Sequence, residues 1–214
     1  MIKTIIFDLG GVIITLDHAQ AVERFKALGL ADADQQLDPY TQNGIFGDLE
    51  GGRIDAETFR KELSKLVGRE LTADECCYAW QGYAKEVPRR NLEVLKKLRA
   101  EGYRLVLLSN TNPFMMEWVD SPLFDGEGHG IRYYMDECYL SYQMQLMKPD
   151  DSFFRKVLMK EQIFPYEVLF VDDGPRNVAA ASQMGINTYC PVNGADWACE
   201  IFDVIRANNQ KQHP

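Results

Sequence analysis

The chain of 214 residues is long enough for one large domain, or for a core domain with a smaller insert. Its formal net charge of −9 argues against nucleic acids and anionic membranes as partners, because both require basic patches on the protein. No apolar run approaches the roughly 20 residues of a membrane span. Residues 1–3 lead directly into an apolar run, so we expect no signal peptide.

The cysteines are odd in number, and no C-x-x-C pair occurs among them. We therefore expect reduced, buried thiols in a cytoplasmic protein. The histidines share no ligand spacing with the cysteines, which argues against a structural metal cluster of Cys and His. The cysteines are Cys76, Cys77, Cys138, Cys190 and Cys199, and the histidines are His18, His129 and His213.

Short apolar runs alternate along the chain with amphipathic segments. The order strand, helix, strand predicts parallel strands joined by crossover helices, and hence a doubly wound α/β sheet. The continuous apolar character of the runs fits a sheet that helices cover on both faces. The predicted strands span 4–9, 104–110, 135–141, 168–173 and 186–192, and the predicted helices span 91–102, 150–161 and 175–185.

One long interval breaks this alternation, because residues 17–87 contain no convincing strand and have helical patterns instead. Within it, Thr72 and Glu75 have the spacing of a capping box, which predicts the start of a helix. We expect this interval to fold as a small helical cap domain. The predicted boundaries are 17–87 for the cap domain, and 1–16 together with 88–214 for the α/β core domain.

Polar side chains stand where several predicted strands end, which is where open parallel sheets bind ligands. Each of them alone also fits a cap of a turn or helix, or a surface position. Three acids gathered at one edge, however, repel one another by about 1 kcal/mol per pair at 4 Å in water, and by about 4 kcal/mol at an effective dielectric of 20. A divalent cation removes this penalty, and oxygen ligands suit Mg²⁺. The side chains are Asp8, Ser109, Asn110, Lys148, Asp172 and Asp173.

The segments FDLGG, LSN, KP and VDD occur in this order and resemble the four motifs of the haloacid dehalogenase superfamily. The resemblance covers essentially the whole chain, because the helical insert lies where that family has its first type of cap. It implies a Rossmann-like core. The segments DLGGV, LSNTN, MKPD and VDDGPRN are further similar to a branch with sugar-phosphate phosphatases, including those that act on glucose 1-phosphate.

The resemblance implies a role for each matching residue. Asp8 is the nucleophile that attacks phosphorus and becomes an aspartyl-phosphate. Ser109 and the amide of Asn110 bind the phosphate, and Lys148 neutralises the nucleophile and the transferring group. Ser109 and Lys148 thus count with Asp8 as catalytic. The implied Mg²⁺ ligands are Asp8, the carbonyl of Gly10, Asp173 and, through water, Asp172.

The sequence departs from the family pattern at Gly10. Most phosphatases of the superfamily have an aspartate two residues after the nucleophile, which protonates the leaving oxygen and then activates water. With glycine at this position the backbone carbonyl can still bind a metal ion, but the carboxyl group that donates the proton is absent. General acid–base catalysis typically contributes 10²–10⁴-fold. Asp17 is the candidate replacement, although it also has the position of a helix N-cap.

Three functions stay open at this stage. The favoured one is a Mg²⁺-dependent phosphatase that hydrolyses a small phosphomonoester, preferably a sugar phosphate, as a cytoplasmic monomer or homodimer. A module that binds a phosphorylated ligand with little turnover is the second, and the intact Asp8 and Lys148 argue against it. A metal-independent 2-haloacid dehalogenase is the third, and it would leave the pair Asp172–Asp173 unused.

The predicted cap is expected to supply substrate specificity. Trp80 and Tyr83 either line the cavity or, at helical spacing, pack in a core. The polar, glycine-rich segment 120–134 is predicted as an exposed loop, with His129 as a candidate substrate contact. Further candidate contacts are Gln42, Asn43, residues 49–52, Asn112, Phe114 and Met115.

Overall fold

The computed structural model describes residues 1–37 and 44–211. Within these ranges, five parallel strands form one sheet in the order β5-β4-β1-β6-β7, so the predicted doubly wound sheet is confirmed. The strands end earlier than predicted, and β1 and β6 end directly before the acidic residues Asp8 and Asp172. Their bounds are β1 Thr4–Phe7, β4 Arg104–Ser109, β5 Glu137–Leu140, β6 Val168–Val171 and β7 Asn187–Tyr189.

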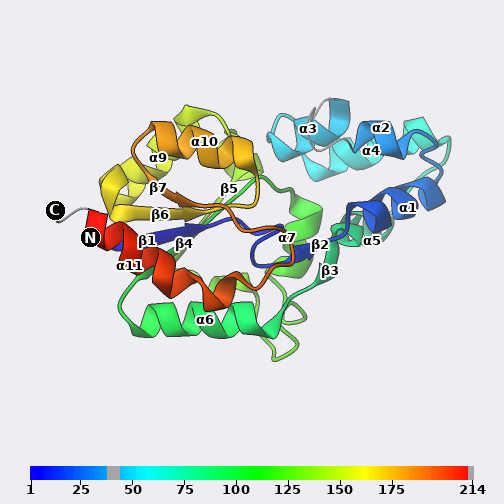
Figure 1. Cartoon of the computed structure of the whole chain (residues 1–214). Coiled ribbons are helices and arrows are strands. Elements are labelled where there is room, and N and C mark those ends of the chain that lie inside the picture. Colours follow the sequence, from blue (N-terminus) through cyan, green and yellow to red (C-terminus); the bar gives the residue numbers. More distant parts are fainter. Residues whose placement is uncertain (38–43, 212–214) are drawn as a thin grey trace.

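Helices cover both faces of this sheet (Figure 1). On one face, α9 and α10 lie over one row of strand side chains, which includes Ile6, Val106 and Phe170. On the other face, α6 and α11 cover the alternate row, which includes Ile5 and Phe7. The bounds of these helices are α6 Arg89–Ala100, α9 Asp151–Glu161, α10 Pro175–Gln183 and α11 Ile201–Lys211.

The helices α1 to α5 pack beside the carboxyl edge of the sheet and not over its faces (Figure 1). Aromatic rings fill the space between them, with centroid distances of 5.2 Å for Phe25–Phe46 and for Phe46–Phe59. Phe59 also contacts Phe114 of α7 at 5.6 Å, which links this group to the core. The bounds are α1 His18–Leu28, α2 Ala33–Gln36, α3 Gly44–Glu50, α4 Ala56–Val67, α5 Ala73–Trp80 and α7 Pro113–Val119.

The prediction that residues 17–87 contain no strand is wrong at one place. Ala84–Glu86 forms β3, which pairs antiparallel with β2 at Thr15–Leu16. The sequence of β3 is only AKE, without a β-branched residue, so its extended form depends on pairing with a strand distant in sequence. The predicted capping box of Thr72 and Glu75 is confirmed at the start of α5.

The shorter elements are mostly connections. The segment 120–134 is only partly exposed, because Phe124, Ile131 and Tyr134 are buried in the core, so the prediction of an exposed loop is wrong for these side chains. Apolar contacts of this kind leave no periodic pattern in the sequence. The remaining helical turns are η1 Gln81–Tyr83, η2 Ile131–Tyr133, α8 Ser141–Met144, η3 Pro165–Glu167 and η4 Trp197–Cys199.

The cysteine prediction is correct for Cys76, Cys77 and Cys138, which are buried and free. It is wrong for Cys190 and Cys199, which are free but exposed, because both lie in connections at the surface. Among the described residues, no helix is both long and apolar enough to cross a bilayer.

We expect Phe59→Ala to lower the free energy of unfolding by about 3–5 kcal/mol, because the fully buried ring contacts Phe46, Trp80 and Phe114 and its loss leaves a cavity. Urea denaturation followed by fluorescence and circular dichroism measures the change. Leu66→Ala is the control, since Leu66 is exposed and its truncation should change stability by less than about 0.5 kcal/mol. Equal effects of the two substitutions would contradict the packing described.

Candidate active site

The sheet register brings polar residues from three strands to one edge. Phe7 of β1 pairs with Leu107 of β4 and with Val171 of β6, so the three strands reach their carboxyl ends at the same level. Asp8 and Asp172 directly follow β1 and β6, and Ser109 is the last residue of β4. The residues predicted from the separate motifs therefore meet at this edge.

The ammonium group of Lys148 joins these strand ends. Its Nζ donates to Asp172 Oδ2 at 2.6 Å and to the carbonyl of Leu108 at 2.9 Å, and it lies 2.9 Å from Asp8 Oδ2. The lysine side chain is only 1% exposed, and three acceptors match its three protons. Lys148 is thus fixed in place and faces Asp8 from within the core.

Asn110 holds the backbone of Lys148. Its side-chain oxygen accepts from the N–H of Lys148 at 2.9 Å, and its side-chain nitrogen donates to the carbonyl of Lys148 at 2.9 Å. The carboxamide of Asn110 is therefore occupied. For a phosphate, Asn110 offers its backbone N–H, beside the buried hydroxyl of Ser109.

The two acids of the VDD segment have different surroundings. Asp172 is fully buried and accepts from Lys148, from the N–H of Gly174 and from the side chain of Asn177, so both of its oxygens are occupied. Asp173 is more exposed and faces Asp8. Of the pair, Asp173 has the freer carboxylate for a metal ion.

The carboxylates of this edge outnumber the cations around them. Oxygens of Asp8, Asp172 and Asp173 lie within 4.8 Å of one another, and Lys148 is the cation between them. Burial raises the pKa of Asp8, against the opposing effect of Lys148. Burial, with the nearby Asp172, also raises the pKa of Asp173 to about 6. The pKa of Lys148 is raised because its two acidic neighbours outweigh its burial.

This donor set fits Mg²⁺. It consists of hard carboxylate oxygens, and no histidine or cysteine side chain belongs to the cluster of Asp8, Asp172 and Asp173 in the described chain. A divalent cation would also compensate the negative charge that raises the carboxyl pKa values. The residues present therefore suit such an ion on chemical grounds.

The two glycines after Asp8 meet different requirements. Gly11 has φ of +75°, and an added Cβ would lie 1.9 Å from Oδ2 of Asp173, so only glycine lets that carboxylate approach. At Gly10 an added Cβ would lie 3.0 Å from the side chain of Leu16. Leu16 therefore packs where a longer side chain at position 10 would begin, and this wall of the site is apolar.

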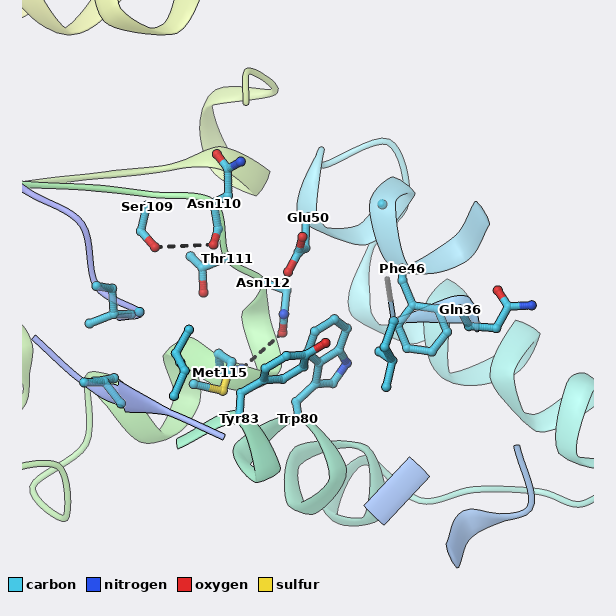
Figure 2. Close-up of a pocket in the computed structure, with 16 residues that line it drawn as sticks. Gln36, Phe46, Glu50, Trp80, Tyr83, Ser109, Asn110, Thr111, Asn112 and Met115 are labelled. Carbon is cyan, nitrogen blue, oxygen red and sulfur yellow. Dashed lines mark hydrogen bonds between the residues drawn. The ribbon is translucent and has the colours of Figure 1, made fainter. Parts of the chain in front are cut away.

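A pocket extends from this edge toward the helices α3 and α5 (Figure 2). Figure 2 shows Ser109 and Asn110 at one end, with Glu50, Trp80 and Tyr83 around the other part. Sequence reasoning missed several lining residues, because apolar side chains in loops and short helices carry no motif. The lining is Leu9, Gly10, Ile14, Leu16, Gln36, Leu37, Phe46, Gly47, Glu50, Trp80, Tyr83, Ser109, Asn110, Thr111, Asn112 and Met115.

The candidate contacts of the sequence analysis divide into two groups. Trp80, Tyr83, Asn112, Met115 and part of residues 49–52 line the pocket, whereas Phe114 packs against Phe59 instead. Trp80 is also buried among aromatic rings, so it both lines the cavity and packs in a core, which were the two alternatives expected for it. Gln42 and Asn43 lie outside the described residues.

Two candidates have other structural roles. Asp17 is the N-cap of α1, where its Oδ1 accepts from the N–H of Gln20 at 2.9 Å, so its expected capping role is confirmed. His129 lies against Asp125 at 2.9 Å and stacks on Tyr133 at 4.0 Å. Neither residue belongs to the lining of the pocket as described. Their prediction as an acid and as a substrate contact is therefore not supported by this geometry.

The sequence matches the haloacid dehalogenase-like hydrolase family over residues 2–185, and the chain belongs to this family. It is 46% identical to a D-ribitol-5-phosphate phosphatase from Bacteroides thetaiotaomicron over 97% of this chain and 100% of that protein.

Two solved structures are also similar. A predicted HAD-like hydrolase from Porphyromonas gingivalis has a TM-score of 0.91 and 42% identity, with coverage of 96% of this chain and 98% of the other. A HAD family enzyme from Bacteroides thetaiotaomicron, in complex with magnesium and inorganic phosphate, has a TM-score of 0.84 and 33% identity, with coverage of 94% and 99%.

We expect Mg²⁺ to raise the melting temperature more at about pH 8 than at about pH 5. Acids with raised pKa values bind more protons in the folded than in the unfolded protein, so the metal-free fold loses stability as pH rises from about 4 through the folded pKa, about 6 for Asp173. A cation binds the deprotonated carboxylates and contributes about 2.7 kcal/mol at 100 times its Kd. Thermal melts with EDTA or Mg²⁺ measure the difference.

Asp173→Asn should abolish this Mg²⁺-dependent shift, whereas Asp151→Asn, at an exposed position of α9, should retain it. A shift that is unchanged in Asp173→Asn would place the ion elsewhere.

Proposed function

We propose that this protein is a Mg²⁺-dependent phosphatase that hydrolyses a small polyol or sugar phosphate through an aspartyl-phosphate on Asp8. The observation that carries the proposal is the position of the Asp8 carboxylate. It lies 2.9 Å from the buried ammonium of Lys148 and within 4.8 Å of the carboxylates of Asp172 and Asp173, and the next two residues, Leu9 and Gly10, line the pocket. The similarity to a D-ribitol-5-phosphate phosphatase supports the same activity.

In the proposed reaction, a carboxylate oxygen of Asp8 attacks phosphorus and the ester P–O bond breaks. The leaving oxygen takes a proton from solvent water and departs as the alcohol, and the water that attacks next returns a proton to the solvent. Water then attacks the aspartyl-phosphate, which returns Asp8 and releases inorganic phosphate. The N–H of Leu9 donates to Oδ1 of Asp8 at 2.7 Å and thereby orients the carboxylate, leaving Oδ2 beside Lys148.

The surrounding residues stabilise the transferring group. Lys148 supplies positive charge beside the nucleophile, and Ser109 with the backbone N–H of Asn110 supplies hydrogen bonds to phosphate oxygens. Asp8, Asp173 and the carbonyl of Gly10 would hold Mg²⁺. Asp172, which was expected as a ligand through water, instead accepts from Lys148, Gly174 and Asn177. When bound, the ion supplies compensation for the negative charge of the carboxylates and the phosphate.

We further propose that residues 17–87 act as a cap domain on a core of residues 1–16 and 88–214. The pocket supports this division, because Phe46, Glu50 and Trp80 line it from one side and Ser109 to Asn112 from the other. The short pair of β2 and β3 lies at the two crossings between these parts. A small phosphorylated metabolite between them would be enclosed on both sides.

The substrate branch predicted from the sequence, glucose 1-phosphate, stays a prediction beside the polyol phosphate of the relative. The cytoplasmic location and the monomeric or dimeric state also stay predictions. The alternatives have less support. A dehalogenase that attacks carbon would leave the acidic cluster without a use, and a module with little turnover would need no nucleophile aligned by Leu9 and Lys148.

We expect Mg²⁺-dependent phosphate release from D-ribitol 5-phosphate, and a loss of at least about 10³-fold in kcat/KM in Asp8→Asn, because the amide is a poor nucleophile. A panel that adds glucose 1-phosphate and flavin mononucleotide, each with Mg²⁺ or EDTA, measures the preference. Asp151→Asn is the matched control, as its carboxylate lies on the exposed face of α9.

Three results would reject the proposal. Equal activity of Asp8→Asn and the control would exclude Asp8 as the nucleophile. Absence of turnover on every ester, together with binding of inorganic phosphate, would favour the binding module. Chloride release from a 2-chloro acid without metal would identify the dehalogenase.

A further inference from the structure

The part of the pocket distant from Asp8 has an uneven distribution of polar groups. Trp80, Tyr83, Phe46 and Met115 make most of this wall apolar and aromatic (Figure 2). Glu50 is the acidic residue among the described lining residues. A carboxylate that lines a pocket can accept hydrogen bonds from a ligand there.

Asn112 directs an amide toward this carboxyl group. Its Oδ1 accepts from the N–H of Met115 at 3.1 Å and so caps α7, which leaves the Nδ2 side of the amide toward the pocket. Figure 2 shows Glu50 extending toward Asn112. Asn112 is 1% exposed, and within the described chain its Nδ2 has no partner at hydrogen-bonding distance. A buried donor of this kind is rare and calls for an acceptor.

Trp80 adds a second donor of the same kind. Its ring lines the pocket, and its buried Nε1 likewise has no hydrogen-bond partner among the described residues. Tyr83 stacks beside it at a centroid distance of 5.8 Å. The wall therefore offers N–H donors next to a carboxyl group, which matches a ligand that both accepts and donates.

The backbone fixes the position of Glu50. Its carbonyl accepts from Ser141 Oγ at 2.6 Å, and the same Oγ accepts from the N–H of Thr111 at 2.9 Å. An added Cβ at Gly52 would lie 2.1 Å from the carbonyl oxygen of Tyr142, so the chain after Glu50 packs directly on α8. Glu50 is thus held by the core beside the strand end that carries Ser109.

We propose that Glu50 and Asn112 form a hydroxyl-binding pair that selects phosphate esters with a polyhydroxylated chain. Asn112 Nδ2 donates to one hydroxyl oxygen, and the Glu50 carboxylate accepts the hydrogen of a hydroxyl. This inference rests on the proposed phosphatase function and assigns the residues that recognise the alcohol part. Apolar walls alone would not favour a polyol over an alkyl chain, whereas paired polar groups lose hydrogen bonds when the hydroxyls are missing.

The surroundings of Glu50 agree with this role. Burial raises the pKa of the Glu50 carboxyl group to about 7, against the opposing effect of Asn112. The hydroxyl of Tyr83 lies near the same carboxyl group, which contributes to the raised pKa of Tyr83 after its own burial. A hydroxyl of the substrate would donate a hydrogen bond to Glu50 and so stabilise its charged form.

The test compares two esters of similar leaving group, D-ribitol 5-phosphate and n-pentyl phosphate, in Glu50→Gln and Asn112→Asp. The glutamine side chain is nearly isosteric with glutamate, and the aspartate side chain retains the oxygen that caps α7. We expect each single substitution to lower the ratio of kcat/KM for the polyol ester to that for the alkyl ester by about 10- to 100-fold, chiefly through KM. Glu62→Gln, on the exposed face of α4, is the control.

The double variant Glu50→Gln with Asn112→Asp exchanges the donor and the acceptor, and we expect it to recover part of the ratio. An unchanged ratio in both single variants would overturn the proposal. So would an equal loss on both esters, since that result indicates proton transfer or structural damage. Asp8→Asn, measured on the same esters, separates these results from a failure of the phosphatase function itself.

Discussion

The buried ammonium of Lys148 is the interaction on which the site depends. It bridges Asp8 after β1, Asp172 after β6 and the carbonyl of Leu108 in β4, so one side chain ties three strand ends together. Removal of one partner from a buried charged pair typically costs about 3–5 kcal/mol, because the other charges stay buried without compensation. The contacts of Lys148 therefore position the residues of the site, and loss of Lys148, Asp8 or Asp172 would leave the remaining charges buried without a partner.

The contacts of Lys148 also explain why Asp172 and Asp173, the two acids that follow β6, have different surroundings. Asp172 has its oxygens occupied by Lys148, Gly174 and Asn177. Asp173 instead packs against the bare backbone of Gly11, which positions it beside Asp8. The inner acid thus positions the lysine, and the outer acid is available to an ion.

The position of Gly10, two residues after Asp8, connects the site with the pocket. Because Leu16 packs beside Gly10, the wall nearest Asp8 is apolar, and the carboxyl group of the pocket comes instead from Glu50 at the end of α3. Ser141 and Gly52 hold that end of α3 against the core. Contacts between the helical part and the core therefore determine which polar groups line the pocket.

The sequence by itself determined the sheet and the strand-end residues. Apolar runs predict strands, and the side chain after each run must lie at the carboxyl edge of a parallel sheet, so Asp8, Ser109, Asp172 and their neighbours were predictable from local pattern and motif order. The helical character of residues 17–87 was also predictable, because the alternation of apolar runs and amphipathic segments is interrupted there.

Only the tertiary structure decided which residues meet across the pocket. The pair Glu50–Asn112, the packing of Leu16 on Gly10 and the strand β3 join segments that lie apart in the sequence. Nothing in the local sequence of AKE predicts a strand, and nothing around Asp17 distinguishes a helix cap from a proton donor. The physical reason is that such roles depend on the partner brought near by folding, and not on the residue's own neighbours.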